Sequence, residues 1–422
     1  MAMVLLLNPP SPADAVANRE GVAGFGALST GFAYPPQTLA VVVAACRQAG
    51  LGAAVLDAVG ERLDWAATVA RIQVAAPALL AVLSSHTTLA ADCAALGGLR
   101  HAFPGLPTVA IGAGARFDAD RLLAAGASHV LLGDPDLALA RLAAAPLPPP
   151  GPVRVRDLLP HQHNHAGLVR DPGLLPRPAW DAVPWSQYGF LTLSTARGCD
   201  DGCTFCAYMA VQGRSFRPRP AAEVVDEMLW LQDVFHPRRI MVRDLVFAAD
   251  RDRALTIARQ LAAAGFRTAW ECESRPEHFD PTLLKQMAQA GCTVIKLGIE
   301  TTDPELLVKL ERIAAVQEAA PYLAYTRRVI ADARRYGIRT RVFVLAGLPG
   351  QTAAHTAATV AFLRQARPDF VHSRPYTSFP HVPLGPAPSS PDLDEQLRSL
   401  EAVAAECQTR SARPSLLRRW LK

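Results

Sequence analysis

The sequence has little charge and little cysteine for its length. Charged residues make up 19% of 422, and the net charge of +5 comes without the Lys/Arg runs that bind nucleic acid. Eight cysteines are too few for a disulfide-stapled secreted scaffold. An uncharged stretch, residues 72–91, contains Pro77 and several polar residues and is a poor membrane span. The N-terminus also lacks the basic segment of a secretory signal. We therefore expect a cytoplasmic protein that binds neither nucleic acid nor membrane.

Composition along the chain predicts its domain organisation. Hydrophobic residues make up 50%, enough for a large core, and the length predicts two or three domains. A proline-rich stretch, residues 146–152, forms a semi-rigid connector. We predict a domain at 1–145, a linker at 146–190, a second domain at 191–385 and a helical tail at 386–422. Three alternate histidines in the linker could bind a metal, or face solvent or substrate: His161, His163 and His165.

Apolar segments alternate with helical patterns in the first 145 residues. The predicted strands are 3–7, 53–56, 79–83, 108–111 and 130–132. This alternation predicts a doubly wound parallel sheet, which binds ligands at the carboxyl ends of its strands. The polar or glycine-rich residues at those ends are Asn8, Pro9, Ser84, Ser85, Thr87, Gly112, Gly114 and Gly133. The glycines do not complete a dinucleotide-binding fingerprint, so a nucleotide-like ligand and a bare scaffold both remain open.

Three cysteines stand within eight residues, at Cys199, Cys203 and Cys206. Thiolates are soft ligands that suit iron–sulfur clusters and zinc. Three thiolates at this spacing fit three corners of a 4Fe–4S cube and leave the fourth iron free. A zinc site in the loop, or a chance cluster of cysteines, is the alternative.

The second region has six predicted strands, at 191–194, 239–242, 268–272, 293–299, 339–345 and 370–373. Helical patterns separate them. Six β–α steps predict a parallel, barrel-like sheet with its chemistry at the carboxyl ends of the strands. Because the cysteine loop directly follows the first of these strands, it should lie at that face.

Both regions resemble the cobalamin-dependent radical S-adenosylmethionine (SAM) enzymes. The resemblance is carried by the cysteine spacing with Phe205 before the last cysteine, and by the segment from Tyr34 to Ala40 with the loops named above. It implies a cobalamin-binding domain, to which Tyr34 would contribute, followed by a partial (β/α)6 barrel. The chain lacks the Asp-x-His-x-x-Gly motif that supplies a cobalt ligand elsewhere. His86 could bind cobalt or make a loop hydrogen bond.

The resemblance also implies the chemistry. The three cysteines would bind a 4Fe–4S cluster whose open iron holds SAM, and an electron from the cluster would cleave SAM to a 5′-deoxyadenosyl radical. Cobalamin would carry a methyl group to an unactivated carbon of a small-molecule substrate of natural-product or cofactor type. A non-methylating outcome (cyclisation, rearrangement or 3-amino-3-carboxypropyl transfer) and a non-enzymatic sensor are the alternatives. We expect a monomer that takes electrons from a donor such as flavodoxin or ferredoxin.

Residues at the strand ends of the second region would contact SAM in such an enzyme. They are Tyr208, Asp244, Arg275, Glu300 and Gly347. Arg275 is expected to pair with the SAM carboxylate, and Glu300 to hold the amine or the ribose. Alternatively, these charges pair with each other, Gly347 serves only turn geometry, and Tyr208 covers the cluster. The family often has an acid pair where this chain has Arg243 and Asp244, so Asp244 would be the single acid there.

Overall fold

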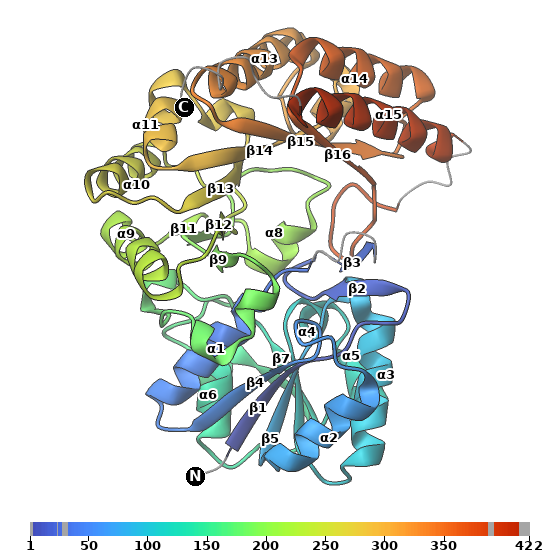
Figure 1. The fold of residues 1–422 in the computed structure, drawn as a ribbon. Helices are drawn as coiled ribbons and strands as arrows, with labels where there is room; N and C mark the ends of the chain where they lie inside the picture. Colours follow the sequence, from blue (N-terminus) through green and yellow to red (C-terminus); the bar gives the residue numbers. More distant parts are fainter. Residues whose placement is uncertain (1–2, 23, 28–32, 387–391, 413–422) are drawn as a thin grey trace. The chain divides into compact units, whose positions relative to one another are not determined.

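The computed structural model describes residues 3–22, 24–27, 33–386 and 392–412, and it divides into two compact units (Figure 1). Unit 1 runs to Leu193 and takes in Val211–Gly213 and Arg217–Arg219. Unit 2 holds the remainder of the chain from Ser194. The finer division into four segments stays a prediction.

Unit 1 is built on a six-stranded parallel sheet in the order β4-β1-β5-β6-β7-β8. Its strands are β1 (Met3–Asn8), β4 (Gly52–Asp57), β5 (Leu79–Leu83), β6 (Thr108–Ile111), β7 (His129–Leu132) and β8 (Gly151–Arg154). The first five confirm the predicted strands. The sixth lies in the stretch predicted to be a connector, and it is an edge strand, the position in a sheet that tolerates its Pro152.

Helices cover both faces of this sheet, as a doubly wound fold requires. They are α1 (Gln37–Gln48), α2 (Trp65–Ala75), α3 (Leu89–Ala102), α4 (Ala113–Phe117), α5 (Ala119–Ala125), α6 (Ala138–Ala143) and α7 (Val155–Leu158). Alternate residues of β1 enter different cores: Val4 and Leu6 pack with α1, while Leu5 and Leu7 pack with residues of α2 and α3. Burial on both faces explains why this strand is a continuous apolar run. An antiparallel pair, β2 (Ala15–Asn18) and β3 (Gly24–Ala27), was not predicted.

The second six-stranded sheet has the order β9-β12-β13-β14-β15-β16, which follows the chain. Its strands are β9 (Leu191–Leu193), β12 (Arg239–Val242), β13 (Ala269–Ser274), β14 (Cys292–Glu300), β15 (Arg339–Ala346) and β16 (Phe370–Pro375). Every pairing from β12 to β16 is parallel. Sequential parallel strands joined by right-handed crossovers put all the helices on one face and leave the other face as a barrel interior. The predicted fold class is therefore confirmed for both sheets.

The remaining helices of the chain accompany the second sheet. They are α8 (Ala207–Gln212), α9 (Ala221–Trp230), α10 (Arg251–Ala263), α11 (Pro281–Gln289), α12 (Pro304–Lys309), α13 (Ala319–Arg335), α14 (Ala353–Ala366) and α15 (Leu393–Ala412). The Asp280 carboxylate accepts from the amides of Thr282 and Leu283, as expected of an N-cap before Pro281. The predicted tail helix is α15, which packs against β16 and α14 (Figure 1). Residues 413–422 of the tail lie outside the described residues.

In the described part of the chain, no helix combines the length and the apolar character needed to cross a membrane.

Candidate functional site

The cysteine loop lies between the short strand β10 (Ala196–Arg197) and helix α8. Cys199 and Cys203 are buried and Cys206 is partly buried. Burial raises the pKa of Cys199 and the pKa of Cys206, each to about 12. A bound metal would supply the positive charge that these thiolates need. Three soft donors on one loop thus fit an iron–sulfur cluster.

No set of three His, Cys, Asp or Glu side chains among the described residues closes on one metal ion. A 4Fe–4S cube does not require that closure, because each cysteine binds a different iron. The three linker histidines do not share one environment either: His163 is buried, whereas His161 and His165 are exposed.

Asp244 holds the backbone that leads into the cysteine loop. Its carboxylate accepts from the amides of Thr195 (2.6 Å) and Ala196 (3.0 Å) and from the Thr195 hydroxyl. Burial raises the pKa of Asp244 above its ordinary value. The guanidinium of Arg253 donates to the carbonyl of Thr195 at 2.6 Å. These bonds give Asp244 a positioning role. Its contact with SAM stays a prediction, and these hydrogen bonds already occupy both oxygens of its carboxylate.

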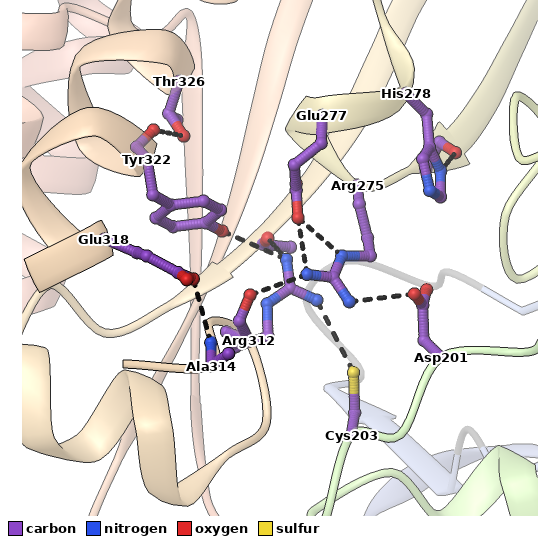
Figure 2. Close-up of polar contacts among 12 residues, drawn as sticks. Asp201, Cys203, Arg275, Glu277, His278, Arg312, Ala314, Glu318, Tyr322 and Thr326 are labelled. Carbon is purple, nitrogen blue, oxygen red and sulfur yellow. Dashed lines mark hydrogen bonds and ion pairs between the residues drawn. The ribbon is translucent and has the colours of Figure 1, made fainter. Parts of the chain in front are cut away.

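Arg275 is already paired with neighbouring groups (Figure 2). It donates to Asp201 at 2.9 Å, to Glu277 at 2.8 Å and to the carbonyl of Arg312 at 2.8 Å. The Asp201 carboxylate also accepts from the Cys199 thiol at 3.3 Å. These contacts match the alternative given above, in which the charged side chains at the strand ends pair with other protein groups and not with SAM. Binding of the SAM carboxylate by Arg275 stays a prediction, and it would require the arginine to exchange a partner.

Arg312 is the site residue that sequence reasoning missed. It follows α12, and 6% of its surface is exposed. One guanidinium nitrogen lies 3.8 Å from the Cys203 sulfur, and another donates to the Gly298 carbonyl and to the Tyr322 hydroxyl (Figure 2). No motif surrounds it in the sequence. Only the fold brings its loop, the end of β14 and the cysteine loop together.

Glu300 ends β14 in a left-handed backbone conformation, with φ of 68°. Such a conformation strains a residue other than glycine. The side chain is buried, and burial raises the pKa of Glu300 to about 7. A Cβ at Gly298 would stand 2.6 Å from a Glu300 carboxylate oxygen, so any larger residue there would require the Glu300 side chain to move. The predicted contact of Glu300 with SAM stays a prediction.

Gly347 follows β15 with φ of 71°, a conformation that favours glycine. Its amide donates to the side chain of Gln396 in α15 at 3.0 Å, and an added Cβ would stand 2.9 Å from Leu393. Turn geometry and packing against the tail helix therefore explain this glycine. Tyr208 lies in the first turn of α8, directly after the cysteine loop. The predicted SAM contacts of both residues remain predictions.

The strand ends of unit 1 carry a buried polar network that the sequence did not reveal. Arg19 and Asp92 form an ion pair of 2.7 Å, and both side chains are fully buried. Arg19 also donates to the Asn8 side chain (3.1 Å) and to the Pro9 carbonyl (2.6 Å). Asn8 in turn donates to Asp57 at 2.8 Å. The network thus joins the ends of β1 and β4 to helix α3.

Two predicted ligand-binding glycines of unit 1 pack against the end of β5. A Cβ at Gly112 would stand 2.7 Å from the Ser84 carbonyl, and one at Gly114 would stand 2.2 Å from the Ser84 hydroxyl. A Cβ at Gly133 would stand 2.4 Å from the Gly167 carbonyl. Close packing within the protein therefore explains these glycines. The Ser84 hydroxyl is buried without a hydrogen-bond partner among the described residues, so a ligand at this edge would find one orphaned polar group.

The remaining predicted residues of unit 1 lie in loops around the same strand ends. Tyr34 packs edge-to-face on Phe190, with ring centroids 6.4 Å apart. Ser85 donates to the Gly21 carbonyl and lies 3.0 Å from the Thr87 hydroxyl. His86 pairs with Asp118 at 2.5 Å, so it makes a loop hydrogen bond. Polar groups at the carboxyl ends of parallel strands are compatible with a ligand there.

Comparison with known proteins shows what this chain is similar to. Residues 193–363 match the Radical SAM superfamily model. The fold resembles the radical SAM methyltransferase TsrM of Kitasatospora setae, with a TM-score of 0.70 at 20% identity, over 91% of this chain and 75% of that one. It also resembles the cobalamin-dependent SAM radical enzyme OxsB, with a TM-score of 0.65 at 14% identity; the match covers 96% of this chain and 56% of OxsB.

One curated relative is an uncharacterised methyltransferase of Pyrococcus horikoshii, 23% identical over 222 residues. That match covers 51% of this chain and 47% of the relative, so the chain spans about half the length of this relative. At these identities the structural likeness establishes the fold, which this chain shares with TsrM and OxsB.

Proposed function

We propose that this chain is a cobalamin-dependent radical SAM methyltransferase that acts on a carbon of a small-molecule substrate. The observation that carries the proposal is the three-cysteine loop on the first strand of a radical SAM domain. Support for cobalamin comes from the fold of unit 1 and from TsrM, whose structure has been solved with cobalamin and a [4Fe-4S] cluster bound. TsrM has also been solved with tryptophan as substrate, which supports a small molecule.

Each part of the chain has a task in this proposal. Cys199, Cys203 and Cys206 hold the cluster, and Asp244 fixes the backbone that presents them. The strand ends of unit 1, with the orphaned Ser84 hydroxyl, hold cobalamin. When bound, the cluster and SAM supply one-electron chemistry and cobalamin carries the methyl group. The electron would come from a donor of the flavodoxin or ferredoxin type, and we propose that the enzyme acts as a monomer.

Anaerobic purification followed by cofactor analysis tests the proposal. The wild-type chain should contain about four irons and one cobalamin, with absorption from both. A Cys203→Ala variant should lose most of its iron and keep its cobalamin, because the two cofactors bind different units.

The reconstituted protein, given SAM, a reductant and candidate substrates, should yield a product heavier by one methylene unit. Absence of iron from the wild-type chain, or an unmethylated product, would contradict the proposal.

A further inference from the structure

The guanidinium of Arg312 is buried, and its hydrogen-bond partners carry no formal charge. Its hydrogen-bond partners are the Cys203 thiol, the Gly298 carbonyl and the Tyr322 hydroxyl. Its Nε is buried and has no partner among the described residues. A buried cation is costly unless an opposite charge compensates it. The carboxylates of Glu300 and Glu277 interact electrostatically with Arg312, but no hydrogen bond among the described residues joins either of them to its guanidinium. The nitrogen that faces Cys203 can therefore still favour an anion at that sulfur.

The sulfur beside Arg312 is the natural place for that anion. The Cys203 sulfur lies 3.8 Å from Nη1, and Cys203 is one of the proposed cluster ligands. Three thiolates bound to an oxidised cluster make an anionic assembly, and reduction by one electron makes it more negative. Charge and hydrogen bonds at the sulfurs are among the factors that set the reduction potential of such clusters.

We propose that Arg312 is a positioning residue that holds the Cys203 sulfur and stabilises the reduced state of the cluster. This inference rests on the proposed function. The step concerned is a one-electron reduction: an external low-potential donor is oxidised, the cluster gains the electron, and Arg312 itself is unchanged. A nearby buried cation favours the more negative, reduced form.

The other contacts of Arg312 explain how it is held in place. The Gly298 carbonyl belongs to β14, and Tyr322 belongs to α13. Together they fix the guanidinium group, so the nitrogen that faces Cys203 is already in position before the cluster binds. Lysine cannot reproduce this arrangement, because its single ammonium group lacks the planar fork.

The test is a redox titration of the reconstituted protein, followed by electron paramagnetic resonance in the absence of SAM. In Arg312→Gln the equilibrium constant for reduction should fall about tenfold, which corresponds to a midpoint about 59 mV more negative. Arg312→Lys, which keeps the charge, should shift less. Arg364→Gln is the control, since Arg364 pairs with Glu406 at 2.8 Å and both side chains are about half exposed; its midpoint should equal that of the wild type.

An unchanged midpoint in Arg312→Gln would overturn the inference, and weaker SAM binding in that variant would then assign Arg312 to SAM instead. If Arg312→Gln assembles no cluster while Arg312→Lys does, the requirement for the charge is supported. Failure of both variants to assemble would overturn a charge effect. A wild-type chain without iron would refute the proposed function itself, which distinguishes the two failures.

Discussion

The strand ends of the two sheets treat buried charge in opposite ways. In unit 1, the cation Arg19 meets the carboxylate of Asp92, and the bonds continue through Asn8 to Asp57. In unit 2, the hydrogen-bond partners of Arg312 are neutral, and Glu300, which interacts with Arg312 electrostatically, is buried with its pKa raised to about 7. Both edges belong to six-stranded sheets with parallel strands.

This difference indicates two kinds of binding edge. The Arg19 network of unit 1 is paired without a ligand and so forms a preorganised scaffold, while the nearby Ser84 hydroxyl is buried without a partner among the described residues. At the edge of unit 2, Arg312 and Glu300 interact electrostatically with no hydrogen bond between them in the described part of the chain, and the Cys199 and Cys206 thiols are neutral because burial raises their pKa to about 12. This edge is therefore less completely paired than that of unit 1. We call the Arg19–Asp92 network of unit 1 the closed network and the edge of unit 2 with Arg312 and Glu300 the open edge. Substitutions that remove a charge from each should change stability differently.

Breaking the closed network should have the greatest effect on stability. Arg19→Gln leaves the Asp92 carboxylate buried without its cation, and should lower the free energy of unfolding by about 3–5 kcal/mol. Urea unfolding followed by circular dichroism measures this change. Arg71→Gln is the matched control, because its ion pair with Glu61 is largely exposed and should contribute only about 0–1 kcal/mol. Equal effects of the two substitutions would contradict the closed network.

Neutralising Glu300 should stabilise the open edge, and the gain should depend on pH. The folded protein raises the pKa of Glu300 from 4.5 to about 7, so it retains a proton that the unfolded chain releases between these values. Wild-type stability contributed by this group is therefore present below pH 4.5 and is lost as pH rises towards 7. The free energy of unfolding of Glu300→Gln relative to wild type should therefore rise with pH through this window, and the total gain should reach about 3 kcal/mol by pH 7.

Unfolding of the unreconstituted wild-type and Glu300→Gln proteins, measured from pH 4 to 8, checks this expectation. Glu406→Gln is the control of opposite sign, because the hydrogen bond from exposed Arg364 lowers the pKa of Glu406. A stability difference for Glu300→Gln that stays flat with pH would refute the assignment.

A smaller effect is expected where glycine packs against the end of β5. In Gly114→Ala the new methyl group would meet the Ser84 hydroxyl, and the overpacking should cost about 1–3 kcal/mol. Gly97→Ala in α3 is the matched control, because its nearest contact of 3.6 Å is ordinary, and it should gain about 0.5–1 kcal/mol. Adding Ser84→Ala to Gly114→Ala should recover part of the loss. Without that recovery, the hydroxyl is not the clashing group.

Much of the fold could be predicted because short stretches of sequence are enough to distinguish its strands from its helices. Five strands of unit 1 and six of the second sheet stand out as apolar segments separated by helical patterns. Strand β8 was missed because its Gly151 and Pro152 are typical of a loop, and only pairing with β7 makes it a strand. Helix α4 was missed because Gly112 and Gly114 also indicate a loop.

The candidate site was predicted less completely. The cysteine spacing led directly to the loop, and the strand ends led to Asp244, Arg275 and Glu300. The partners of these residues were not predictable: a carboxylate that holds backbone amides and one that binds a ligand look alike in a sequence. Arg275 shows the same limit, since its pairing with Glu277 and Asp201 depends on how two loops pack.

By itself, the sequence determined the alternation of strands and helices and the three-cysteine loop, because spacing along the chain decides both. The tertiary structure alone decided which charges are buried and with what they pair. Arg312 and Cys203 stand 109 positions apart, and Arg19 and Asp92 stand 73 apart. The energy of a charge depends on the groups and water around it, and only the folded chain sets those surroundings.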